Sequence, residues 1–193
     1  MLDTRGRKYF DRIFDKIGRS FLKIGFIPTH ITIIAAMVGI VGAVSFSLGK
    51  FILSIILLWI SGFLDAVDGS IARKTKTTSL FGTLMDITFD RIVETSIILS
   101  LAMRYSNARI NFIVLLICII ISMTIFLTVG ALVEKKGMKS FYYQAGVAER
   151  SEGFLMFSLM ILVPNYIVIF TNLFSAIIFI TIIQRIIEAK KIL

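Results

Sequence analysis

The chain has 193 residues, of which 57% are hydrophobic and 17% charged, and it contains 17 Phe but only 2 Pro. With a mean hydropathy of +0.91, this composition excludes an ordinary soluble domain. The formal net charge of +9 fits either nucleic acid or an anionic membrane surface, and the placement of the charges between apolar runs favours the membrane. The sequence therefore predicts an integral membrane protein, with no nucleic acid among its partners.

Residues 1–25 mix basic side chains with apolar ones at mostly three- and four-residue spacing, as Phe10, Phe14, Ile17 and Phe21 show. This pattern is typical of an amphipathic helix that lies at a membrane interface. A secretory signal peptide would instead have an uninterrupted apolar core. We therefore predict that residues 1–25 form a juxtamembrane helix on the cytoplasmic leaflet and stay on the protein.

Six apolar runs follow, each of about the length that a bilayer requires. They lie near residues 29–48, 51–72, 80–103, 110–133, 147–164 and 166–187. The predicted fold class is therefore an all-α integral membrane protein, with residues 26–193 forming one six-helix domain. With six spans, the Lys and Arg residues fall in segments on the same side of the membrane as the N-terminus, except Lys50, Arg104 and Arg109 on the other side and Arg91 within a span. The positive-inside rule then places both termini in the cytoplasm, and we expect the plasma membrane as the location.

Four aspartates interrupt the second and third apolar runs, although an ionised Asp at the centre of a bilayer costs at least about 2.5 kcal/mol. On a helix Asp65 shares one face with Asp68, and on the next helix Asp86 shares one face with Asp90. A rise of ~1.5 Å per residue places Asp65 and Asp86 both roughly 8 to 9 Å from the cytoplasmic edge of the core. The two pairs of carboxylates are therefore expected to meet at similar depth, toward the cytoplasm.

Two interpretations of these carboxylates compete. Helix capping, or ion pairs with neighbours such as Arg73 and Arg91, can account for one or two of the aspartates. Two pairs at matched depth are better explained by Mg²⁺ or Mn²⁺, which prefer carboxylate oxygens and keep positions for water and substrate phosphate. Two divalent cations would balance four negative charges, so Asp65, Asp68, Asp86 and Asp90 are predicted metal ligands.

The aspartates belong to a longer pattern, Asp65-x-x-Asp68-Gly69-x-x-Ala72-Arg73, then eight residues, then Gly82-x-x-x-Asp86-x-x-x-Asp90. This pattern resembles the signature of the CDP-alcohol phosphatidyltransferase family. The resemblance implies a membrane enzyme that joins the lipid part of a CDP-linked lipid to a small polar alcohol and releases CMP. It also implies divalent metal cofactors and an active site on the cytoplasmic side.

The resemblance further implies roles for individual residues. Asp65, Asp68 and Asp86 are chiefly metal ligands, whereas Asp90 both contacts metal and acts as the catalytic base. Arg73 offers a forked donor to phosphate, and Gly82 is also expected to permit close packing of helices. The residues implied to bind the CDP part of the substrate are Pro28, Thr32, Asp68, Gly69, Ala72, Arg73, Ser79 and Gly82.

The segments around Thr32 and Asp90 resemble the phosphatidylinositol phosphate synthases within this family. That subgroup binds its acceptor with basic residues, but this chain has Gly130, Leu132 and Gly153 at three of those positions. We therefore expect glycerol 3-phosphate as the acceptor, with inositol phosphate or another polar alcohol as the alternative. The donor is CDP-diacylglycerol or its archaeal equivalent, and the candidate acceptor-binding residues are Arg150, Lys135 and Lys139.

A divalent-cation transporter that uses the same carboxylates is the competing function. A transporter usually binds its ion near the midplane between repeated halves, whereas these aspartates lie toward the cytoplasm and no internal repeat is visible. The family resemblance also predicts a homodimer. Ala35, Gly39 and Ala43 form a stripe of small residues that permits close helix packing, either between two copies or within one.

Overall fold

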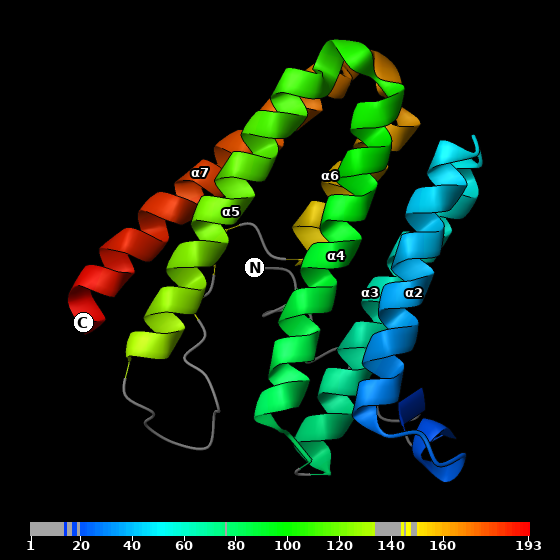
Figure 1. The fold of residues 1–193 in the computed structure, drawn as a ribbon, viewed down its shortest axis with the longest axis vertical. Coiled ribbons are helices and arrows are strands. Elements are labelled where there is room, and N and C mark those ends of the chain that lie inside the picture. Colours follow the sequence, from blue (N-terminus) through cyan, green and yellow to red (C-terminus); the bar gives the residue numbers. More distant parts are fainter. Residues whose placement is uncertain are drawn as a thin grey trace. The chain divides into compact units, whose positions relative to one another are not determined.

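The computed structural model describes residues 14, 17–18, 20–75, 77–133, 144, 146–147 and 150–193. Within these residues the chain is helical and has no strand. The elements are α2 (Pro28–Ser47), α3 (Phe51–Lys74), α4 (Leu80–Arg104), α5 (Arg109–Leu132), α6 (Arg150–Leu162) and α7 (Ile167–Ile192), with 3₁₀ turns at Ser106–Ala108 and Pro164–Tyr166 (Figure 1). The predicted all-α class is confirmed.

Four helical segments among the described residues are long and apolar enough to cross a membrane. They are Pro28–Ser47, Phe51–Lys74, Ser106–Leu132 and Pro164–Ile192. The remaining two predicted spans are not confirmed, because α4 has 25 residues but carries four ionisable side chains near its middle, and α6 has only 13 residues. A membrane protein with several spans is therefore supported, and the count of six stays a prediction.

Most of the predicted juxtamembrane helix lies outside the described residues. Its described positions, residues 14, 17–18 and 20–23, are helical. Phe14 packs in a buried cluster with Ile31 of α2 and with Val67 and Ile71 of α3. Because Val67 and Ile71 flank Asp68, this cluster holds the N-terminal segment against the acidic part of α3. Its location at a membrane surface stays a prediction.

The chain forms two compact units, one from Thr4 to Arg104 and the other containing Tyr105–Leu193. In the first unit α2 packs along both α3 and α4. In the second unit α7 packs against α5 and α6. All four predicted metal-binding aspartates belong to the first unit, so its helix packing determines whether they can meet.

Polar contacts connect α5 and α7 in the second unit. Arg185 is only 7% exposed, and its Nη1 donates to the backbone oxygen and the hydroxyl of Ser122, both at 2.8 Å. The amide of Asn111 donates to the side chain of Asn172 at 2.8 Å. Sequence analysis counted Arg185 only as a cytoplasmic charge, whereas the structure buries it in a helix that can span the membrane.

Small residues on α2 allow the three helices of the first unit to approach closely. Ala35 and Ala43 are 2% and 3% exposed, and Gly39 is buried between them. A Cβ atom on Gly39 would lie 2.6 Å from Cγ1 of Val93 in α4 and 2.8 Å from Oγ of Ser61 in α3. The small-residue stripe therefore packs within one subunit and gives no support to the predicted homodimer, which stays a prediction.

We expect Gly39→Ala to lower the free energy of unfolding by about 1 to 3 kcal/mol, because the added methyl group overpacks the contact with Val93 and Ser61. Thermal melting of the purified protein in mild detergent measures this change. Val44→Ile adds a carbon to the same helix at a side chain that is 51% exposed, so it should leave the melting temperature nearly unchanged. A Gly39→Ala protein as stable as the wild type would contradict the close approach of α2, α3 and α4.

Candidate metal centre

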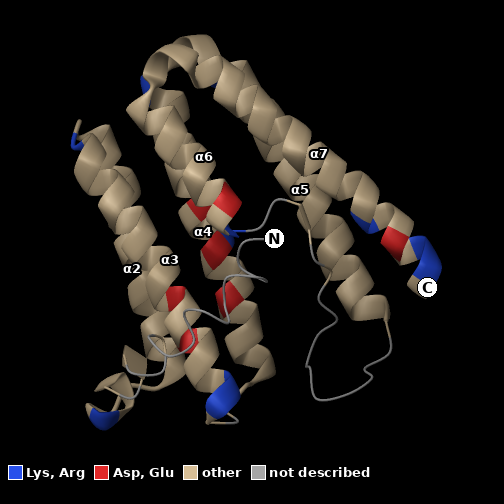
Figure 2. Cartoon of the chain, turned by 180° about the vertical axis from the view of Figure 1, so that it is seen from behind, with Lys and Arg blue, Asp and Glu red and all other residues tan. Residues whose placement is uncertain are grey.

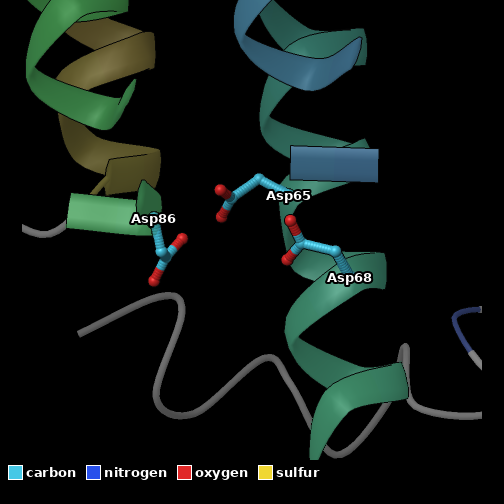
Figure 3. A group of neighbouring side chains, drawn as sticks. All are labelled: Asp65, Asp68 and Asp86. Atoms are coloured by element: carbon cyan, nitrogen blue, oxygen red, sulfur yellow. The ribbon is translucent and has the colours of Figure 1, made fainter. Parts of the chain in front are cut away.

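Three carboxylates from two helices come together in the first unit. Asp65 and Asp68 are three residues apart on α3, which directs both side chains to the same face, and Asp86 projects from α4. One carboxylate oxygen from each residue lies within 4.8 Å of the other two. Figure 3 shows Asp65 and Asp68 pointing from α3 toward Asp86. The predicted meeting of acidic faces from neighbouring helices is therefore observed.

The close contact around Gly39 helps to bring these carboxylates together. Ser61, which borders Gly39, lies one helical turn before Asp65 on α3. Val93, on the other side of Gly39, lies two turns after Asp86 on α4. Figure 2 shows the acidic positions within α3 and α4, whereas Lys and Arg lie mostly near helix ends. The acidic site is thus built into the packed part of the helices.

Electrostatic repulsion within this group is large. Two ionised carboxylates this close repel each other by about 3 to 4 kcal/mol at the effective dielectric constant of a protein. Asp68 is only 5% exposed, and its Oδ2 is buried without a hydrogen-bond partner among the described residues. The Thr32 side chain and the Gly69 backbone also interact with the Asp68 carboxylate.

These features fit a divalent cation. The donor set consists of oxygen atoms only, which is the preference of Mg²⁺ and Mn²⁺. A bound cation would offset the repulsion among Asp65, Asp68 and Asp86 and would satisfy the buried Oδ2 of Asp68. The residues present can therefore hold the predicted cofactor.

Asp90 lies outside the group of three. It follows Asp86 by one turn of α4, and its electrostatic neighbours are Asp86, Arg91, Glu94 and Asp68. Of the four predicted ligands, three have carboxylate oxygens within 4.8 Å of one another, and the fourth, Asp90, is close to them. This difference separates Asp90 from the other aspartates in its surroundings.

The predicted CDP-binding residues lie in the same unit as the aspartates. Pro28 is in the first turn of α2, and its carbonyl oxygen accepts a hydrogen bond of 3.1 Å from the Thr32 hydroxyl. At the other end of the motif, Ala72 is half-buried near the end of α3. Arg73 folds back over Gly69, where a Cβ atom would lie 3.1 Å from its Nη1. The absence of a side chain at Gly69 therefore leaves room for the Arg73 guanidinium.

Ser79 and Gly82 have a local structural role at the start of α4. The backbone N–H of Gly82 donates to Oγ of Ser79 at 2.9 Å, which satisfies one of the amide groups that a helix start leaves without a partner. Among the described residues, the only atom near a Cβ placed on Gly82 is Oγ of Ser79, at 3.0 Å. The expectation that Gly82 permits close packing between helices is therefore not supported.

The predicted acceptor-binding residues belong to the second unit. Arg150 is the first residue of α6, and its guanidinium carbon lies 5.7 Å from the ring centre of Phe154. Lys135 and Lys139 lie outside the described residues. Arg185, which sequence analysis did not select, is a further cation of this unit. Its signal in the sequence is a basic residue within a long apolar helix, a combination that often marks a functional position.

Comparison with known proteins identifies the family. The family model of CDP-alcohol phosphatidyltransferases matches residues 25–187. The chain belongs to the CDP-alcohol phosphatidyltransferase family. The archaetidylinositol phosphate synthase of Pyrococcus horikoshii is 32% identical over 178 residues, which are 92% of this chain and 90% of that protein. The phosphatidylinositol phosphate synthase of Mycobacterium tuberculosis is 29% identical over 150 residues, which are 76% of this chain and 67% of that protein.

Crystal structures of the phosphatidylinositol phosphate synthase of Mycobacterium tuberculosis have a similar fold. The structure with CDP-DAG bound gives a TM-score of 0.75 at 23% identity and covers 92% of this chain and 94% of that chain. The structure with manganese and citrate gives a TM-score of 0.70 at 24% identity and covers 92% of this chain and 88% of that chain. These comparisons show that the chain shares its overall fold with that enzyme.

Family membership decides between the functions that the sequence left open. It confirms the predicted transferase and gives no support to a cation transporter. Together with the carboxylate group, it also confirms a divalent cation as the cofactor class. The relatives are named for inositol phosphate lipids, so the expected glycerol 3-phosphate acceptor is not supported and the inositol phosphate alternative fits better.

We expect Asp65→Asn to weaken Mn²⁺ binding by at least about tenfold, since even residues that only support a metal ligand cost 10- to 100-fold when changed. Calorimetric titration of the protein with Mn²⁺ measures this effect without substrate. In the presence of a chelator the same variant should melt at a higher temperature than the wild type, because one repulsive charge is removed.

Glu188→Gln is the matched control, because it removes a carboxylate charge from α7, outside the group. Equal Mn²⁺ affinity in Asp65→Asn and in the wild type would show that the three carboxylates do not form the cation site.

Proposed function

We propose that this chain transfers the lipid phosphate group of a CDP-linked lipid to a hydroxyl of an inositol phosphate and releases CMP. The observation that carries the proposal is the group of three carboxylate oxygens within 4.8 Å inside a membrane protein of this family. The acceptor is inferred from the two relatives whose names include inositol phosphate. The donor is CDP-diacylglycerol or its archaeal counterpart.

In this proposal Asp65, Asp68 and Asp86 hold divalent cations, Mg²⁺ or Mn²⁺, and two ions match the charge of the four aspartates. A divalent cation supplies positive charge that neutralises the pyrophosphate of the donor and the departing phosphate. Asp90 accepts the proton of the acceptor hydroxyl, and the hydroxyl oxygen attacks the phosphorus that carries the lipid. The bond between that phosphorus and the CMP oxygen breaks, and CMP leaves with the electron pair.

The CDP part of the donor is bound next to the aspartates. The space over Gly69 and the fork of Arg73 suit a phosphate oxygen, because guanidinium groups bind phosphate through two parallel hydrogen bonds. The proposed nucleotide-binding residues also include Pro28, Thr32 and Ala72. At the start of α4 they include Ser79 and Gly82. Thr32 already contacts Asp68, which supports a role close to the cations.

Basic residues are proposed to bind the phosphate of the acceptor. Arg150, Lys135 and Lys139 are the residues that sequence analysis selected, and we add Arg185 because it is buried. Leu132, at a position where the subgroup has a basic residue, is 62% exposed. The acceptor phosphate must therefore rely on these remaining cations, and the affinity for the acceptor is expected to be lower than in relatives with the full set.

The proposal includes three features of the whole protein. Residues 26–193 form the catalytic domain with six spans, and residues 1–25 form the juxtamembrane helix. Both termini and the active site face the cytoplasm at the plasma membrane, as the distribution of Lys and Arg indicates. The protein is a homodimer, a proposal that native mass measurement in mild detergent tests directly.

A panel of acceptors tests the proposed reaction. Purified protein in detergent, supplied with CDP-diacylglycerol or its archaeal counterpart and Mn²⁺ or Mg²⁺, should release CMP faster with inositol 1-phosphate than with glycerol 3-phosphate, free inositol or serine. The Asp65→Asn protein is the control for cation-dependent turnover. Faster CMP release with glycerol 3-phosphate would overturn the acceptor, and no CMP release with any acceptor would overturn the reaction.

Asp90→Asn tests the assignment of the base. The amide keeps the shape and one oxygen of the carboxylate but cannot accept a proton, and general-base assistance is worth typically 10²- to 10⁴-fold. We expect turnover to fall by at least about 10²-fold, while the affinity for the CDP-linked lipid changes by less than about tenfold.

Turnover, lipid affinity and melting temperature are measured on the same Asp90→Asn preparation. If Asp90 only stabilises α4, the variant will melt at a lower temperature and its folded fraction will turn over at the wild-type rate, which contradicts the base assignment.

A further inference from the structure

An ion pair lies beside the metal centre, on the helix that carries Asp86 and Asp90. Nη1 of Arg91 donates a hydrogen bond to Oε2 of Glu94, three residues further along α4. The Glu94 side chain is 13% exposed and the Arg91 side chain is 35% exposed. Nε of Arg91 is buried without a hydrogen-bond partner among the described residues. Glu94 is therefore largely shielded from solvent, whereas Arg91 is partly exposed.

The spacing of charges along α4 places Glu94 next to the site. Asp86, Asp90 and Glu94 follow one another every four residues, so they form one acidic stripe along the helix. The charges of Arg91 and Glu94 both act on Asp90, and they act in opposite directions. The pair thus presents no net charge to the stripe, whereas Arg91 alone would present a positive charge directly after Asp90.

Arg91 has one acidic partner at helical spacing on α4. The residues three and four positions before and after it are Ile87, Thr88, Glu94 and Thr95, and these positions are neighbours on a helix surface. The Thr95 hydroxyl donates to the backbone oxygen of Arg91 and does not compensate its charge. Without Glu94, the uncompensated guanidinium would act on Asp90, the aspartate one turn after Asp86.

We propose that Glu94 is a positioning residue that neutralises Arg91 and thereby maintains the cation affinity of Asp65, Asp68 and Asp86. The inference rests on the cation site of the proposed function. A positive charge beside a divalent cation raises the free energy of the bound state, and this repulsion is strong at short range in a medium of low dielectric constant. Glu94 also holds the Arg91 guanidinium in a hydrogen bond to its own carboxylate.

Four proteins test this proposal: the wild type, Glu94→Gln, Arg91→Gln and the double variant. Mn²⁺ binding is measured by calorimetry without CDP-linked lipid, and the melting temperature of each protein is measured in a chelator. Glu94→Gln should weaken Mn²⁺ binding by roughly tenfold, since it leaves Arg91 uncompensated. Arg91→Gln should strengthen binding by a few-fold, roughly two- to fivefold, since it leaves an additional negative charge. The double variant should return to within about threefold of the wild type.

The two single variants are expected to change the Mn²⁺ affinity in opposite directions, which distinguishes charge compensation from a purely structural role. If the pair only stabilises α4, both single variants will melt at lower temperatures and bind Mn²⁺ with equal or similarly reduced affinity, and the proposal is overturned. Arg104→Gln is the matched control, because it removes a cation from the same helix roughly 20 Å along the axis from Arg91. It should leave the Mn²⁺ affinity unchanged. If Glu94→Gln fails to fold, the strengthening in Arg91→Gln and its absence in the double variant still decide.

Failure of this inference can be told apart from failure of the proposed function. Asp65→Asn is titrated in parallel with the four proteins. If the wild type binds Mn²⁺ no better than Asp65→Asn, the cation site itself is wrong. If Asp65→Asn loses binding while all the Arg91 and Glu94 variants match the wild type, the cation site stands and the role of Glu94 is overturned.

Discussion

The structure depends on holding negative charges together where they repel each other most strongly. Asp65, Asp68 and Asp86 place one oxygen each within 4.8 Å of the others, and the Asp68 side chain is buried. Each ionised pair costs about 3 to 4 kcal/mol, and this energy must come from packing elsewhere. The close approach of α2 to α3 and α4 at Gly39 is one source, because small residues allow backbones to come near and gain dispersion contacts. The site is thus kept under electrostatic strain that a cation relieves.

Sequence reasoning succeeded where helix geometry alone determines the answer. The relative positions of Asp65 and Asp68 follow from their spacing on one helix, and counting residues along the two helices predicted that Asp86 would meet them. The exclusion of Asp90 from the group of three required the rotation of α4 relative to α3, which spacing does not contain. For the same reason a packing role for Gly82 could not be derived from the sequence, since a glycine permits close packing only where another helix lies opposite it.

The sequence left other features open because they depend on pairing between residues. Ala35, Gly39 and Ala43 can pack against another copy or against the same chain, and the contact of Gly39 with Val93 selects the second. Arg185 was counted as a cytoplasmic charge, because its bonds to Ser122 depend on how α5 and α7 pack. The ion pair of Glu94 with Arg91, three residues before it, was also not predicted, because each charge was considered separately.

The ion pair on α4 and the four aspartates are parts of one charge balance. Four aspartates carry four negative charges, which two divalent cations would match. Arg91 would disturb this match by one positive charge, and Glu94 restores it. A site without Arg91 and Glu94 would have the same net charge, so charge neutrality alone does not explain why α4 carries the pair. A hydrogen-bonded pair on the same face of α4 as Thr95 adds local stability to a helix segment that carries several acidic side chains. It therefore stabilises the strained part of α4 without changing the charge that the cations meet.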